Sequence, residues 1–182
     1  GRVTGVVVNG RTVDAELVVA ATGRTGHITG DVRAPAEGGD SGFSYVARMY
    51  RARAGAVVPV SPVPFAAEHA GYITIAFPQD AGTVCALIVR PSADRELADL
   101  RHEQVFQRAT AAIPNLARWT DPDRFQPITP VMAGAGLANS YRSHLDEQGG
   151  VPLAGLLFVG DAVSTTNPAA GRGVTLGLLQ AQ

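Results

Sequence analysis

The stretch GLLFVGDAVSTTNPAAGRGVTLGLLQ, residues 155–180, decides how the rest of the sequence is interpreted. Its apolar residues 156–159 predict a short buried strand, which ends at Gly160 and Asp161. A small polar loop follows, and residues 174–180 have the composition of a helix. A strand that leads through a glycine-containing loop to a helix N-terminus is typical of an anion- or nucleotide-binding site. The stretch therefore predicts an α/β fold with a ligand near this loop.

The loop has features that favour a bound ligand over a plain connection. Pro168 favours an extended turn, because the residue before a proline avoids the helical region. Gly171 and Gly173 let the backbone approach a ligand without a Cβ in the way. A helix that begins near Val174 would direct its N–H groups and its dipole at that ligand. The Gly-Asp pair alone is more typical of an ordinary strand–loop–helix connection, so the order of all these features carries the prediction.

The composition is that of a globular domain, or of one domain with part of another. The chain has 182 residues, 46% of them hydrophobic and 17% charged. A net charge of −1 offers no electrostatic case for binding nucleic acid or an anionic membrane. Cys85 is the only cysteine, so an internal disulfide and a cysteine-based zinc site are excluded, and a reducing, cytoplasmic location is expected. No run of about 18 apolar residues predicts a membrane span.

The first part of the chain predicts strands that end in a loop. Asn9-Gly10 lies between two β-branched runs, which predicts a hairpin because both turn residues must tolerate positive φ. Residues 15–21 form an apolar run without alternation, which predicts a strand buried on both faces of a parallel sheet. This strand ends in the small-residue loop 22–26, at the edge where open α/β sheets bind ligands. Both ends of the chain lie within predicted elements, so we expect a piece of a longer protein.

The middle of the chain predicts antiparallel strands and one helix. Residues 27–42 are rich in Gly, Asp and Pro and predict a connection between two layers or domains. Strands are expected over residues 43–53, 72–77, 83–89 and 128–132, the second and third as an antiparallel pair. A helix is expected over residues 93–113, capped by Ser92 and stopped by Pro114. Trp119 and Phe125 are expected to anchor the segment that follows to the sheet.

Two of these stretches resemble a known superfamily. LLFVGDAVSTTNPAAGRGVTLGLLQA is similar to the second flavin-binding motif of FAD-dependent monooxygenases and reductases, the p-hydroxybenzoate hydroxylase-like proteins, which include squalene epoxidase and the geranylgeranyl reductases. AELVVAATGRTG resembles their Ala-Thr-Gly segment. The order of the two motifs, with an antiparallel insertion between them, also matches. The resemblance implies part of an FAD/NAD(P)-binding α/β fold at residues 1–26 and 155–182. It also implies an α+β substrate-binding domain, an antiparallel sheet with a helix, at residues 27–154.

The resemblance also implies roles for individual residues. Asp161 would bind the ribityl hydroxyls of the flavin, and Gly160 would permit their close approach. The segment from Pro168 through Gly171, Arg172 and Gly173 would pass beside the flavin ring, with the following helix directed at the ring's pyrimidine edge. Thr22 and Gly23 would lie near the pyrophosphate.

One family feature does not occur in this sequence. The superfamily opens with a Gly-x-Gly-x-x-Gly strand–turn–helix and a later acidic residue for the adenosine ribose. Gly134-Ala135-Gly136 and Gly171-Arg172-Gly173 both lack the third glycine. We therefore expect this chain to supply the walls on the ring and substrate sides of an FAD site without the wall on the phosphate side.

The remaining candidate residues are less specific. The four histidines have no metal-ligand spacing, so no metal is expected, and no serine lies in a Gly-x-Ser-x-Gly context. Arg48 and Tyr50 belong, by resemblance, to the substrate sheet and are candidates for binding substrate. Arginines that merely solvate an exposed sheet face are the more common alternative.

Three functions remain open. The first is an FAD-dependent monooxygenase or reductase that acts on an apolar or aromatic small molecule, with NADPH or NADH as a candidate electron donor. The second is a non-catalytic substrate-domain module that binds no flavin on its own. The third is an unrelated nucleotide-binding α/β protein, which predicts phosphate contacts at Gly171–Gly173 and no antiparallel sheet in the middle.

Overall fold

The chain folds into two compact units. The computed structural model describes residues 1–26, 28, 32–59, 65–168 and 171–182. Unit 1 comprises Gly1–Ser41 and Leu137–Gln182, and unit 2 comprises Gly42–Gly136. The sequence placed these boundaries at 26/27 and 154/155, so the inserted unit is shorter than expected. The reason is strand pairing, because β4 (Glu37–Asp40) and β11 (Ala138–Tyr141), both expected in the insertion, pair with each other inside unit 1.

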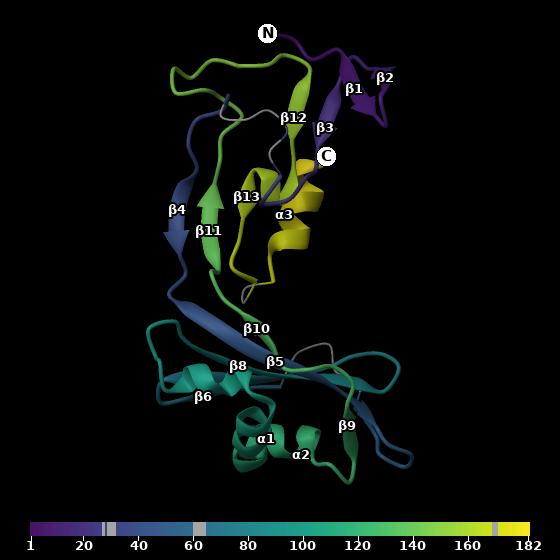
Figure 1. The fold of residues 1–182 in the computed structure, drawn as a ribbon, viewed down its shortest axis with the longest axis vertical. Coiled ribbons are helices and arrows are strands. Elements are labelled where there is room, and N and C mark those ends of the chain that lie inside the picture. The colour runs from purple at the N-terminus through teal and green to yellow at the C-terminus, as the bar shows by residue number, and fades with distance from the viewer. Residues whose placement is uncertain (27, 29–31, 60–64, 169–170) are drawn as a thin grey trace. The chain divides into compact units, whose positions relative to one another are not determined.

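An antiparallel sheet of six strands forms unit 2 (Figure 1). The strand order is β10–β5–β8–β7–β6, and β9 also pairs with β5. The bounds are β5 Phe43–Ala52, β6 Phe65–His69, β7 Tyr72–Pro78, β8 Thr83–Pro91, β9 Phe125–Pro127 and β10 Met132–Gly134. The predicted antiparallel pair in the middle of the chain is therefore confirmed as β7 and β8. This sheet excludes the third hypothesis, which required no antiparallel sheet there.

The strand expected at 128–132 is wrong, because strands flank this segment instead of filling it. β9 and β10 both pair antiparallel with β5, one on each side of the gap. In between, the backbone N–H of Ile128 still donates to the carbonyl of Met49 at 2.9 Å. Pro130 has no N–H to donate, which prevents a continuous ladder.

One face of this sheet is covered by helices (Figure 1). They are the 3₁₀ helix η1 (Leu97–Arg101), α1 (Glu103–Ala112) and α2 (Pro114–Thr120). The single helix expected over 93–113 is therefore broken, and its expected cap is wrong. Ser92 lies before the helix start: η1 begins after Glu96 without a side-chain capping bond, and the Leu97 N–H donates to the Asp94 side chain at 3.0 Å. Pro114 ends one helix and also opens the next, because its missing N–H costs nothing at a first helical position.

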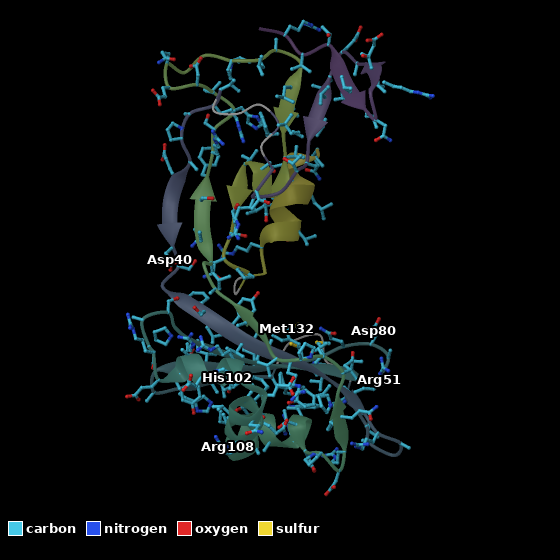
Figure 2. All side chains as sticks on the ribbon, in the orientation of Figure 1. Asp40, Arg51, Asp80, His102, Arg108 and Met132 are labelled. Carbon is cyan, nitrogen blue, oxygen red and sulfur yellow. The ribbon has the colours of Figure 1, made fainter. Side chains whose placement is uncertain are left out.

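The core of unit 2 lies between the sheet and these helices, in the space that side chains fill in Figure 2. Sheet residues such as Tyr50 and Ile88 pack there against Phe106 of α1, and all three are at most 1% exposed. Burying each such side chain stabilises the fold by about 1.5–3 kcal/mol. Trp119 and Phe125 are 3% and 1% exposed in the same cluster, which confirms their predicted role as anchors.

Unit 1 consists of small sheets and one helix. The predicted hairpin is confirmed as β1 (Gly5–Val8) and β2 (Arg11–Asp14), with Asn9 at φ +51° and Gly10 at φ +78°. β3 (Val18–Ala20) pairs in parallel with β12 (Leu156–Phe158). β11 pairs with both β4 and β13 (Ser164–Thr165), and the predicted C-terminal helix is α3 (Gly173–Gln180). No helix among the described residues is long and apolar enough to cross a membrane.

The strand expected over 15–21 is shorter and less buried than predicted. Only Val18–Ala20 are extended and paired. Ala20 is 1% exposed, whereas Leu17 and Val19 are 57% and 52% exposed. β3 pairs with β12 alone among the described strands, and strand side chains alternate between faces, so only one face packs.

Candidate functional site

The quoted stretch forms a strand followed by a tight turn, as expected. Phe158 at the end of β12 is 5% exposed, and the next N–H, of Val159, donates to the Ala20 carbonyl at 3.2 Å. The chain then turns through η2 (Gly160–Ala162), closed by a 2.9 Å hydrogen bond from the Val163 N–H to the Gly160 carbonyl. Gly160 has φ +65°, which is the left-handed region that glycine adopts most readily. The glycine thus determines the direction in which Asp161 leaves the strand.

The loop after β3 makes a second glycine-dependent turn. Gly23 has φ +70°, and its carbonyl accepts a hydrogen bond from the Gly26 N–H at 3.4 Å. A Cβ on Gly26 would collide with the side chain of Thr22. The side chain of Thr22 therefore packs against Gly26 inside the loop. Gly23 occupies a backbone conformation that favours glycine.

These two turns meet at a cavity of about 290 Å³ within unit 1. We call it the Gly23–Asp161 pocket, because it unites the ends of the two parallel strands. Of the expected cofactor-binding residues, it brings together Gly23 and Asp161 only. Thr22, Gly160, Pro168, Gly171, Arg172 and Gly173 are not in its lining. The described lining residues are Gly23, Arg24, Gly26, Arg33, Ala36, Ser140, Arg142, Asp161, Ala162, Val163 and Thr165.

The C-terminal part of the motif forms its own turn and helix. Gly171 has φ +62°, and its N–H donates to the Pro168 carbonyl at 3.0 Å. Arg172 precedes the helix without a side-chain capping bond. Among the described residues, a Cβ on Gly173 would meet the Thr166 hydroxyl, at 3.9 Å, which is ordinary van der Waals contact. At the other end of α3, the Gln180 side-chain oxygen accepts a hydrogen bond from the Gly160 N–H at 2.6 Å, which ties the helix to the turn.

Two arginines of the pocket were missed by the sequence-based analysis. Arg33 is 7% exposed, donates to the Ala162 carbonyl at 2.9 Å, and places its guanidinium carbon 3.5 Å from the centroid of the Phe158 ring. Arg142 donates from Nε to the Ala34 carbonyl at 3.1 Å. Arg33 lies in the segment interpreted as a connection, and a lone arginine there carries no signal of burial. The pairing of β11 with β4 and with β13 brings these segments to the pocket.

The arginines change the electrostatics around the pocket. Burial lowers the pKa of the Arg33 guanidinium from its usual range, and the positive charge of Arg142 lowers it further. Burial also lowers the pKa of the His144 imidazole, and Arg33 adds to that effect. His144 packs against Phe158 with ring centroids 6.0 Å apart, and its Nδ1 accepts a 3.5 Å hydrogen bond from the Phe158 N–H. Burial therefore weakens the preference of both Arg33 and His144 for the charged form, and a neighbouring positive charge weakens it further.

The expected substrate residues Arg48 and Tyr50 lie on the face of the sheet that the helices cover. Both point from β5 toward the helices and are 9% and 1% exposed. Arg48 donates to Glu103 and to the Thr129 carbonyl, each at 3.0 Å, and Tyr50 donates to the Gln107 side-chain oxygen at 3.1 Å. Burial raises the pKa of Tyr50. These contacts are those of a helix-to-sheet interface.

The opposite face of the same sheet is apolar. Side chains alternate along each strand, so the neighbours of the core residues point away from the helices. Met132 on β10, labelled in Figure 2, is 42% exposed and pairs with Ala47 of β5. Gly134 is necessary beside it, because a Cβ there would collide with the ring of Tyr45. The remaining apolar positions that alternate onto this face from β5, β7 and β8 are Met49, Ile73, Ile75, Phe77, Cys85, Leu87 and Val89.

The comparisons with known proteins concern the fold. No family model matches the sequence, and no curated protein matches it. Among solved structures, the myxobacterial chondrochloren halogenase CndH, an FAD-dependent enzyme, aligns with a TM-score of 0.70 and 16% identity over 98% of this chain and 41% of its own. PqsL of Pseudomonas aeruginosa, a probable FAD-dependent monooxygenase, aligns with a TM-score of 0.62 and 18% identity over 97% and 47%. The flavin-dependent brominase Bmp2, as a triple mutant, gives a TM-score of 0.67 and 14% identity over 98% and 45%.

The chain has the fold of FAD-dependent halogenases and monooxygenases. The resemblance stated from the two motifs is thereby confirmed at the level of the fold, and so is the fold class. The chain spans less than half the length of each of these proteins. Both units contribute to the likeness, because the alignments cover nearly the whole chain.

Proposed function

We propose that this chain is part of an FAD-dependent oxidoreductase, and that unit 1 binds the flavin at the Gly23–Asp161 pocket. The observation that carries the proposal is the pocket's position at the carboxyl ends of the parallel strands β3 and β12. Ligands of open α/β sheets bind at that edge. Two glycines with positive φ, Gly23 and Gly160, shape the turns that leave these strands.

The residues of the pocket fit the polar part of FAD. Asp161 supplies carboxylate oxygens that accept hydrogen bonds from hydroxyl groups such as those of a ribityl chain. Arg33 and Arg142 suit phosphate oxygens, since a guanidinium presents paired donors. The pocket's volume of about 290 Å³ is just below the usual range for ligand sites, so it suits part of the cofactor. Bound flavin would supply the redox chemistry, and this chain's residues would bind and orient it.

We further propose an apolar or aromatic small molecule as substrate. The apolar face of the unit 2 sheet, which includes Met49, Leu87 and Met132, supports this class because it would desolvate a nonpolar compound favourably. Monooxygenation and reduction both fit such a site, with NADPH or NADH as electron donor. Unit 1 would then be the partial FAD-binding domain and unit 2 the substrate-binding domain.

The experiment is flavin binding by the purified full chain. We expect FAD to bind, and Asp161→Asn to weaken the affinity about tenfold, because it removes a charged hydrogen-bond acceptor. Asp80→Asn is the matched control: Asp80 lies in the β7–β8 loop of unit 2 (Figure 2) and is exposed. Fluorescence quenching of the flavin measures both affinities. A chain that takes up no flavin would contradict the proposal for this chain and favour a non-catalytic substrate-domain module.

A further inference from the structure

A second cavity lies in unit 2, between the sheet and the helices that cover it. It has a volume of about 220 Å³, and all of its described lining residues are apolar or aromatic. We call it the Tyr72–Ala109 cavity. Its walls include Tyr72 of β7, Ile88 of β8, Leu97 and Leu100 of η1, and Ala109 and Ala112 of α1.

This cavity lies on the helix-covered face of the sheet. Ile88 alternates along β8 with Leu87 and Val89, which belong to the opposite, apolar face. Ile88 and Leu100 are 1% and 4% exposed, so the floor of the cavity is buried. Ala112 near the end of α1 is exposed, so the cavity opens to solvent there. The sheet therefore separates this cavity from the surface proposed to bind substrate.

Small side chains on α1 leave this space unfilled. Val105, Ala109 and Ala112 follow one another at helical spacing along one stripe of the helix. Protein interiors contain few voids larger than a water molecule, because each void forfeits packing contacts. Water gains little in this space, since a buried water needs two or more polar partners and the described lining offers one hydroxyl, that of Tyr72. An apolar ligand would therefore fill the cavity more favourably than water does.

The Tyr72 ring is a wall that is held in place before any ligand arrives. It stacks on the His69 ring, with centroids 4.5 Å apart and planes 11° apart. His69 in turn forms a 2.9 Å hydrogen bond from Nε2 to the hydroxyl of Thr74, which donates to the Asn115 side-chain oxygen at 2.9 Å. A wall that is already ordered costs a ligand little conformational entropy on binding.

We propose that the Tyr72–Ala109 cavity binds an uncharged aromatic compound of a single ring. An apolar cavity of about 150 Å³ is enough to bind benzene, so 220 Å³ has room for one ring with a small substituent. Charged compounds are disfavoured, because the described lining has no charged side chain to pair with them. The Tyr72 ring favours an aromatic partner over an aliphatic one, through offset or edge-to-face contact. This site goes beyond the proposed function and does not depend on it.

Fluorobenzene is the probe, and its ¹⁹F NMR signal in a titration of the full chain measures binding. We expect saturable binding that Ala109→Leu weakens at least tenfold, because the larger side chain occupies the cavity. Ala111→Leu is the matched control, since Ala111 is exposed on the same helix and lies outside the described lining. Tyr72→Leu keeps an apolar wall without the ring and should also weaken binding. Thermal melts show which variants are folded.

Three further outcomes decide the site and the class of ligand. No saturable binding, or equal binding by folded Ala109→Leu and Ala111→Leu, would overturn the site. Fluorocyclohexane that binds as tightly as fluorobenzene would overturn the aromatic class. Met132→Gln, on the opposite face of the sheet, should leave fluorobenzene binding unchanged, and a loss there would place the probe on that face instead. A chain that binds fluorobenzene through this cavity but takes up no flavin would support this inference and contradict the proposed function.

Discussion

The guanidinium of Arg33 lies 3.5 Å from the centroid of the Phe158 ring, so a residue from the segment before β4 closes over the end of β12. The same guanidinium donates to the Ala162 carbonyl, one residue beyond Asp161. A single buried side chain therefore holds both the strand that enters the pocket and the turn that leaves it. This contact is available for a quantitative test because each partner can be removed separately.

We expect Arg33 and Phe158 to be energetically coupled. A double-mutant cycle with Arg33→Met and Phe158→Leu should give a coupling of about 1–2 kcal/mol, the range for a desolvated cation–π contact. Urea denaturation measures the free energy of unfolding of each variant. Arg118 and Phe65 of unit 2, 5.0 Å apart by the same measure, form the matched pair and should couple more weakly. Equal coupling energies in the two pairs would contradict the argument that burial strengthens the contact between Arg33 and Phe158.

Gly160 and Gly177 should respond in opposite directions to alanine. Neither position has an atom within 4 Å of an added Cβ, so space does not decide the outcome. Gly160 has φ +65°, where an L-residue costs about 1–2 kcal/mol, so Gly160→Ala should destabilise the fold. Gly177 lies inside α3, where alanine is favoured over glycine by about 0.5–1 kcal/mol. Thermal melts of the two variants check the sign, and stabilisation by both would refute the strain argument.

Arg48 should matter for stability and not for ligand binding. It is 9% exposed and donates to Glu103 and to the Thr129 carbonyl. Arg48→Met should leave the carbonyl and carboxylate without their donor and cost about 1–3 kcal/mol. Glu103→Gln should cost less than about 1 kcal/mol, because the Glu103 side chain is 54% exposed. We also expect both variants to bind flavin with unchanged affinity. A loss of flavin affinity in Arg48→Met alone would indicate that Arg48 contributes to the binding site.

His144 should make stability depend on pH. Burial and the charge of Arg33 lower its pKa in the folded state below the ordinary value of 6.5. The unfolded chain therefore binds more protons just below that pH, so stability falls as pH drops from 6.5 toward the folded-state pKa. His144→Gln should flatten this part of the profile, measured as the melting temperature between about pH 7.5 and pH 5. An identical profile in the variant would exclude His144 as the cause.

Local patterns predicted the elements whose cause is local. Asn9-Gly10 specifies a hairpin because both residues tolerate positive φ, and the hairpin forms. The apolar run before Gly160 forms β12, and residues 173–180 form α3. The sequence-based predictions were wrong where pairing with a distant strand determines the structure. Residues 15–21 form only a short strand with one exposed face, and 128–132 breaks at Pro130 between two strands that both pair with β5.

For the candidate site, the motifs indicated Gly23 and Asp161, which the structure brings to one pocket. They also indicated Arg48 and Tyr50, which it buries under the helices instead. Strand alternation determines which face a residue occupies, but the sequence does not show which face the helices cover. Arg33 and Arg142 had no motif, because their role depends on pairing between β4 and β11.

By itself the sequence determined the glycine turns, the strand that precedes Asp161, the helix after it and the resemblance to flavoproteins, since each depends on residues that are close in the chain. The tertiary structure alone decided where the units divide, which sheet face is covered, and that Arg33 and Arg142 line the same pocket. Those outcomes depend on contacts between distant segments, such as Arg33 against Phe158, whose energy no local pattern encodes.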